Sequence, residues 1–274
     1  MAGEALVTRS RISLFGVLTV CVALFLVIPT LVVLIASLTK GRQIVFPPQG
    51  LTFNWYAQIV RDAPTWHALV NSFYVAGVSV VLSILAGVPA ALALPGLRPY
   101  RRVIATLAVS LGLFSPIIVS AFAFFDVFLR IGIVNHLTSV GVGIAIVNFP
   151  FMLWTVISAL EDQDPELPAA AATLGADPVE QFIFVRLPLI APGIVTGAII
   201  IFVLSITDFV VSEVLTNVND YTLPVFIYSS LRATISPSLG AAAALFIGMS
   251  VAVFTIVLRI GGVERFLLRQ GGSP

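Results

Sequence analysis

Residues 169–188 read AAAATLGADPVEQFIFVRLP and lie between two long apolar runs of the chain. Alanine is the strongest helix former, so we expect a first short helix from Pro165 to Leu174. Gly175 follows at the position where a left-handed residue caps the end of a helix. The stretch therefore predicts a folded segment rather than a passive linker.

A second helix is expected directly after this turn. Asp177 is its predicted N-cap, Pro178 fits the first helical position, and Glu180 completes a capping box. The helix is expected to continue through Val185 and to end at Pro188. Two capped helices with small alanines between them predict a docking surface, and the alternative is that the loop folds only to be soluble. Acidic residues surround the segment, namely Glu161, Asp162, Asp164 and Glu166.

The composition of the whole chain is that of an integral membrane protein. Of its 274 residues, 59% are hydrophobic and 10% are charged, and the mean hydropathy is +1.09, far above the range of soluble domains. The balance of 14 Lys and Arg against 13 Asp and Glu argues against nucleic-acid binding. Cys21 is the only cysteine, which excludes an internal disulfide or a cysteine-based metal site.

Runs of about 20 apolar residues, the length that crosses a bilayer, predict an all-α, polytopic protein with six transmembrane helices. They lie near residues 12–38, 69–95, 103–129, 140–160, 188–215 and 240–260. The arginines cluster on one side of this topology, which predicts that both termini are cytoplasmic. The chain then divides into a cytoplasmic N-terminus (1–11), a first helix (12–38), a periplasmic loop (39–68), a core with five helices (69–260) containing a cytoplasmic loop (161–187), and a cytoplasmic tail (261–274).

Ionisable groups inside the predicted spans mark a candidate translocation path. Helical spacing in the fifth span places Ser205, Asp208 and Ser212 on one stripe, and a buried acid favours a cationic solute. The alternative is that Asp208 only accepts hydrogen bonds from a neighbouring element. For Asp126 and Glu213, the other acids in or near the spans, we favour a position at the outer interface.

The spacing within the opening stretch resembles the EAA loop of ABC importer permease subunits. The matching positions are Ala170, Ala171, Gly175, Val185, Leu187 and Pro188. Ala169 stands where the family usually has glutamate, and Val185 replaces an isoleucine. Glu166, one turn earlier, is a candidate to take the place of the missing acid, and Asp177 belongs to the same loop.

This resemblance implies a type I ABC importer permease fold in the bacterial inner membrane. It also implies a dimeric ABC ATPase that docks on the loop and uses ATP and magnesium, a second permease that is a different chain, and a periplasmic or lipid-anchored solute-binding protein. The sequence itself would also permit a homodimer of this chain. Further stretches resemble the second permease of spermidine/putrescine importers, namely FPPQGLTFNWY (46–56), NSFYVAGVSVVLSILAGVPAALAL (71–94) and the run from 202 to 245. Related permeases for aminoethylphosphonate, opines or iron(III) remain alternatives.

The residues themselves contain no motor and no catalytic centre that we can identify. The sole lysine, Lys40, lies between Thr39 and Gly41, so it does not end a phosphate-binding loop. No catalytic constellation is recognisable, and His67 and His136 lack the spacing of a metal site. An ion-driven secondary transporter also fits six spans with buried acids, but it leaves the spaced loop unexplained.

Overall fold

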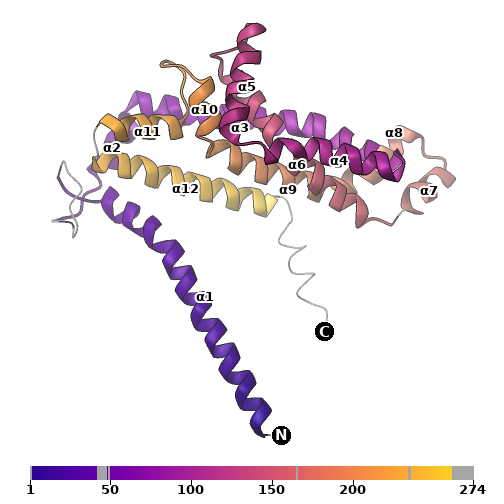
Figure 1. The fold of residues 1–274 in the computed structure, drawn as a ribbon, viewed down its shortest axis with the longest axis horizontal. Coiled ribbons are helices and arrows are strands. Elements are labelled where there is room, and N and C mark those ends of the chain that lie inside the picture. Colours follow the sequence, from indigo (N-terminus) through magenta and orange to yellow (C-terminus); the bar gives the residue numbers. More distant parts are fainter. Residues whose placement is uncertain (1, 42–47, 49, 165, 234–235, 261–274) are drawn as a thin grey trace. The chain divides into compact units, whose positions relative to one another are not determined.

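The computed structural model describes residues 2–41, 48, 50–164, 166–233 and 236–260, so the expected tail at 261–274 and Pro165 lie outside the described residues. Apart from one β-bridge between Thr39 and Leu51, the elements of this part are helical (Figure 1). In chain order they are α1 (Ala2–Ser37), α2 (Asn54–Arg61), α3 (Ala63–Ala93), the 3-10 turn η1 (Leu94–Gly96), α4 (Pro99–Phe114), α5 (Ile117–Arg130), α6 (Leu137–Glu161), α7 (Glu166–Thr173), α8 (Pro178–Glu180), the π-helical turn η2 (Gln181–Arg186), α9 (Leu187–Ile206), α10 (Val210–Leu215), α11 (Leu223–Ala233) and α12 (Pro237–Ile260).

The described residues contain enough long apolar helices for a polytopic protein. Five stretches have the length and hydropathy of a membrane span, and α4 with α5 makes a sixth if the two are taken together. The five are Gly16–Ser37, Ala63–Gly96, Leu137–Glu161, Pro178–Ile206 and Pro237–Thr255. The prediction of an all-α, polytopic membrane protein is therefore confirmed.

The third predicted span, 103–129, is not one straight helix. The chain bends by 98° between α4 and α5. Ser115 is extended (φ −75°, ψ 136°), and Pro116 precedes the first residue of α5. Proline disfavours a helical conformation in the residue before it and provides no backbone N–H, so the break falls at this dipeptide.

Two compact units divide the chain, and the larger one comprises Pro64–Tyr228 and Gly248–Pro274. Within it, α6 packs along α9 (Figure 1). A Cβ atom on Gly193 would lie 2.6 Å from the backbone oxygen of Thr155, and one on Gly197 would lie 3.0 Å from the sulfur of Met152. The small residues at positions i and i+4 of α9 thus let the two backbones approach closely, as in other membrane helix pairs.

The smaller unit comprises Met1–Ala63 and Ser229–Ile247. Its short helix α2 is held to the end of α1 by two side chains. The Tyr56 and Ser37 hydroxyls are hydrogen-bonded at 2.6 Å, and the Trp55 indole N–H donates to the Thr39 carbonyl at 2.9 Å. Ile59 of α2 is buried against the first turns of α12, so this unit has a small core of its own.

Candidate functional site

We call residues 161–187 the docking loop. Its first helix is α7, which carries Ala170 and Ala171. The helix ends at Thr173, and Gly175 in the turn after it has the expected left-handed conformation, with a φ of +93°. Gly175 N–H donates to the Ala172 carbonyl at 3.0 Å, and Ala176 N–H donates to the Ala171 carbonyl at 3.1 Å. These two bonds are the Schellman pattern, which satisfies the last carbonyls of a helix and fixes the direction in which the chain leaves it.

Asp177 starts the next helix with the predicted capping box. Its carboxylate accepts hydrogen bonds from the Val179 and Glu180 N–H groups, both at 2.8 Å. In return, Glu180 Oε2 accepts from the Asp177 N–H at 3.0 Å. One residue, Ala176, separates the two caps. The turn between α7 and α8 is therefore fixed by hydrogen bonds on both sides.

The second helix does not end at Pro188, and this part of the prediction is wrong. The chain stays helical from Pro178 to Ile206, with Val185 in the π-helical turn η2 and Leu187 and Pro188 opening α9. At the junction, Leu187 N–H donates to the Phe182 carbonyl, five residues earlier. The wider π turn changes the hydrogen-bond register just before Pro188, which has no N–H to donate, so the helix can continue.

The loop presents apolar side chains that nothing in the described chain covers. Leu174 is 89% exposed, Phe184 is 74% exposed and Val179 is 62% exposed. Ala170 is exposed as well, and Glu166 lies exposed in the first turn of α7. Several large exposed apolar side chains in one segment are typical of a protein–protein contact. The signal in the sequence was the apolar run 182–185 inside a polar loop.

The candidate path residues do not form a stripe on one continuous helix, as the fifth predicted span required. α9 ends at Ile206, residues 207–209 are not helical, and α10 starts at Val210. Ser205 and Ser212 are buried, whereas Asp208 is half-buried.

Hydrogen bonds made by Asp208 nevertheless link these three residues across the break between α9 and α10. Asp208 N–H donates to the Ser205 carbonyl at 3.3 Å, and Asp208 Oδ1 accepts from the Ser212 N–H at 2.9 Å. The carboxylate thus satisfies a donor in the first turn of α10, as N-terminal capping side chains do. The hydroxyl of Ser205 has no hydrogen-bond partner among the described residues.

The other acids near the spans lie at exposed positions. Asp126 forms an ion pair with Arg130 one turn later, with Arg130 Nε and Asp126 Oδ2 2.9 Å apart, and Glu213 is exposed. The i to i+4 spacing of Asp126 and Arg130 is a signal that sequence reasoning missed. Asp126 is therefore balanced by a base, whereas Asp208 forms no ion pair with the described residues.

Long-range contacts hold the segment between α10 and α11 against the start of α3. Asn71 Nδ2 donates to the Tyr221 carbonyl at 3.0 Å, and the Leu223 N–H donates to Ser72 Oγ at 2.8 Å. After this segment, the Tyr228 ring on α11 lies 4.6 Å from the Phe209 ring, between centroids. An aromatic pair therefore stands next to Asp208 in the chain. Contacts between residues 150 apart leave no local signal in a single sequence.

Comparisons with known proteins agree on one family. The family described as "Binding-protein-dependent transport system inner membrane component" matches residues 79–262. The spermidine/putrescine transport system permease protein PotC of Haemophilus influenzae is 27% identical over 247 residues, covering 90% of this chain and 96% of that protein. The putrescine transport system permease protein PotI of Escherichia coli is 26% identical over 231 residues, covering 82% of each chain.

A solved structure shares the fold. It is a bacterial ABC transporter involved in the import of the acidic polysaccharide alginate, one chain of which matches with a TM-score of 0.70 and 18% sequence identity. The match covers 92% of the present chain and 96% of that chain. The likeness therefore includes the helices on both sides of the docking loop.

Proposed function

Because the chain belongs to the family of binding-protein-dependent transport system inner membrane components, we propose that its cargo is a small cationic solute, in the first place a polyamine. The chain is a multi-pass permease subunit of an ABC importer in the inner membrane. The names of the relatives PotC and PotI, which refer to spermidine and putrescine, support a polyamine cargo. The half-buried Asp208 forms no ion pair with a base among the described residues, and an unbalanced acid supports a cationic cargo.

The doubly capped turn of the docking loop is the observation that carries the coupling part of the proposal. A turn fixed by a Schellman motif and a capping box can transmit a displacement without deforming. The exposed apolar side chains of the loop indicate that a partner protein buries them. The partner that we propose is an ABC ATPase dimer, which binds ATP and magnesium outside this chain. The contact and coupling residues are Glu166, Ala170, Ala171, Gly175, Asp177, Val185, Leu187 and Pro188.

The translocation path in this proposal runs past the turn that contains Ser205, Asp208 and Ser212. A second permease, a different chain, forms the other half of the path, and a periplasmic or lipid-anchored binding protein delivers the solute. Both termini face the cytoplasm, because that orientation puts the arginine-rich loops and the docking loop on the side where ATP is available.

Affinity purification from native membranes tests the docking loop. The variant is Gly175→Trp, because a side chain at φ +93° strains the turn while nothing lies within 4 Å of the added Cβ atom. Gly132→Trp is the matched control, since Gly132 also has a positive φ, +76°, and the same open surroundings. We expect the ATPase to accompany the wild type and the control, and to be lost with Gly175→Trp.

The same preparation tests the cargo and the competing class of transporter. A binding protein that is recovered with the chain is titrated with spermidine, putrescine, aminoethylphosphonate and iron(III), and a polyamine is expected to bind most tightly. Recovery of the intact wild type without any ATPase would contradict the coupling proposal and would favour uptake driven by an ion gradient.

A further inference from the structure

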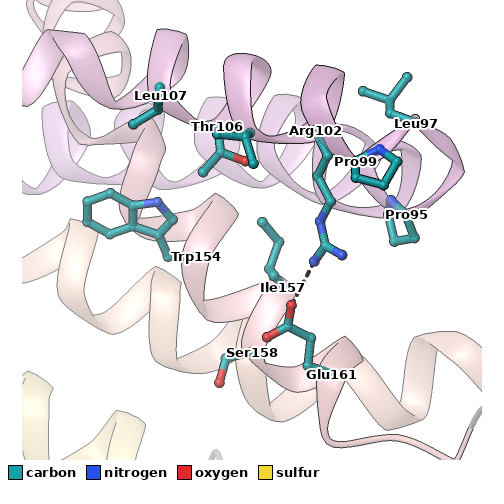
Figure 2. A pocket seen from close by; sticks show the side chains of 11 residues that line it. Pro95, Leu97, Pro99, Arg102, Thr106, Leu107, Trp154, Ile157, Ser158 and Glu161 are labelled. Carbon is teal, nitrogen blue, oxygen red and sulfur yellow. Dashed lines mark hydrogen bonds and ion pairs between the residues drawn. The ribbon is translucent and has the colours of Figure 1, made fainter.

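The cavity between α4 and α6 is lined mostly by apolar side chains (Figure 2). It has a volume of about 690 Å³, and the two charged side chains of its lining form an ion pair, with Arg102 Nη2 and Glu161 Oε1 2.6 Å apart. Because these two charges neutralise each other, the lining selects no charged occupant. The short helix α2, in contrast, has an open apolar face whose surroundings indicate what covers it.

The residues of α2 and its N-cap fall into three groups at 3.6 residues per turn. The groups are Trp55, Tyr56 and Ile59; Phe53, Ala57 and Val60; and Asn54, Gln58 and Arg61. The first group is turned inward, because Ile59 is buried against α12 and the two aromatic side chains bond to the end of α1. The third group is polar and exposed.

The second group is apolar and yet exposed. Phe53 is 73% exposed, Val60 is 56% exposed, and Ala57 between them is exposed as well. A short helix with one open apolar face beside an open polar face is typical of helices that lie in the plane of a membrane surface. Such a helix keeps its polar face in water and its apolar face in lipid.

Contacts with α1 place α2 at the end of a membrane span. The apolar stretch Gly16–Ser37 is long enough to cross the hydrocarbon core, and the polar residues Thr39 and Lys40 follow it. The Ser37 and Tyr56 hydroxyls are 2.6 Å apart, and the Thr52 N–H donates to the Leu38 carbonyl at 2.8 Å. The chain therefore returns to the end of this span just before α2 begins.

Helix α12 places α2 at the same level independently. The span Pro237–Thr255 begins at Pro237, and Ile59 of α2 packs against Ala241 and Ala242, close to this beginning. A Cβ atom on Gly240 would lie 3.2 Å from the backbone nitrogen of Ser37, so α12 begins beside the end of α1. Two spans thus end at the level of α2.

We propose that the face formed by Phe53, Ala57 and Val60 binds the membrane surface, at the boundary between the headgroups and the acyl chains. In the orientation proposed above this is the outer leaflet, whereas the contact itself depends neither on the ATPase nor on the cargo. A soluble partner approaching from water would meet the polar face first, which favours lipid as the occupant of the apolar one.

This contact would anchor the outer end of α1. Within the described chain, no residue of the most apolar window of Gly16–Ser37 is buried, so the span has little packing of its own to fix its depth. The bonds of Trp55 and Tyr56 join its end to α2. A helix held in the membrane surface therefore sets the level at which α1 leaves the bilayer.

Spin labels on single cysteines of the whole transporter test the proposal. Cys21→Ser removes the only cysteine, and a nitroxide is then attached at position 53 or 60 on the apolar face, or at position 58 on the polar face. The transporter is reconstituted in phosphatidylcholine vesicles. Accessibility to oxygen and to a water-soluble nickel chelate gives the depth of each label, calibrated with lipids labelled along the acyl chain.

We expect the labels at positions 53 and 60 to lie about 5–10 Å below the lipid phosphates, as the apolar face of an interfacial helix does. The label at position 58 should lie on the water side of the phosphates, because Gln58 belongs to the polar face. Position 58 is the matched control, since it is exposed on the same helix. Elution of each labelled complex at the volume of the wild type shows that it is assembled.

Equal accessibility to the nickel chelate at positions 53, 58 and 60 would overturn the proposal. Labels at positions 53 and 60 that neither reagent reaches would overturn it as well, because a protein would then cover the face. Benzoylphenylalanine at position 60 or 58, with Cys21 retained, gives a second reading. Lipid adducts are expected at position 60 and few at position 58, whereas crosslinks from position 60 to another subunit would contradict a lipid contact.

Discussion

Asp177 and Glu180 cap one another: the Glu180 carboxylate accepts a hydrogen bond from the Asp177 N–H at 3.0 Å, and the Asp177 carboxylate accepts one from the Glu180 N–H at 2.8 Å. This reciprocal pair lies at the centre of the docking loop, two residues after the left-handed Gly175. Because both side chains are exposed, their contribution is to order the turn rather than to build a core.

Replacing Asp177 with alanine should loosen the turn without unfolding the membrane helices. The loss of an N-cap costs about 1 kcal/mol, which corresponds to about a fivefold weaker association with the ATPase if the ordered turn is the form that docks. Asp177→Asn should retain most of the affinity, since asparagine caps helices as well as aspartate does. Titration of the purified permease complex with the ATPase measures the affinity of each variant. An equal loss of affinity in Asp177→Ala and Asp177→Asn would show that the charge of Asp177, not its capping, matters.

Gly175→Ala should be more harmful than Gly175→Asn. Both side chains have room, since nothing lies within 4 Å of a Cβ atom at this position, so the difference comes from the backbone. A residue other than glycine pays about 1–2 kcal/mol in the left-handed conformation, and asparagine visits it more readily. ATP hydrolysis coupled to substrate uptake, measured in vesicles, should therefore fall in the order glycine, asparagine, alanine. The reverse order for the last two variants would contradict a role of the left-handed turn.

The caps of the docking loop were predictable because their signals are local. A cap depends on residues within four positions of the helix end, and Gly175, Asp177 and Glu180 are of the required types. The end of the second helix was not predictable by the same rule. Pro188 usually ends a helix, but the π turn before it removes the conflict, and no single residue in the sequence signals such a turn.

The membrane helices show the same division between local and non-local information. Hydropathy located the spans, but it did not show that α9 ends at Ile206, because apolar residues continue to Leu215 in a separate short helix. The contact between Ser72 and Leu223 depends on packing across the unit. The position of Asp208 in a turn, rather than on a helix stripe, follows from this break.

Gly193→Ala and Gly112→Ala should have opposite effects on stability. A methyl group at Gly193 would lie 2.6 Å from the Thr155 carbonyl oxygen, whereas nothing lies within 4 Å of one at Gly112 on α4. Overpacking at the α6–α9 contact should cost about 1–3 kcal/mol, and Gly112→Ala should gain up to about 1 kcal/mol of helix propensity. Thermal unfolding of the assembled transporter in detergent measures both. A Gly193→Ala protein as stable as the wild type would show that the two helices can separate without loss.

Asp208→Asn should lower the uptake of a cationic solute and leave the assembly intact. An asparagine Oδ1 can still accept the Ser212 N–H bond now at 2.9 Å, so the variant removes the charge and keeps the cap. Asp208→Ala removes both the charge and the cap and should also reduce the amount of assembled complex.

Asp126→Asn is the matched control, because that acid is exposed and paired with Arg130, and it should leave uptake unchanged. Radiolabelled spermidine uptake into cells, normalised to the assembled complex, separates these cases. Full uptake by an assembled Asp208→Asn transporter would leave Asp208 with the capping role alone.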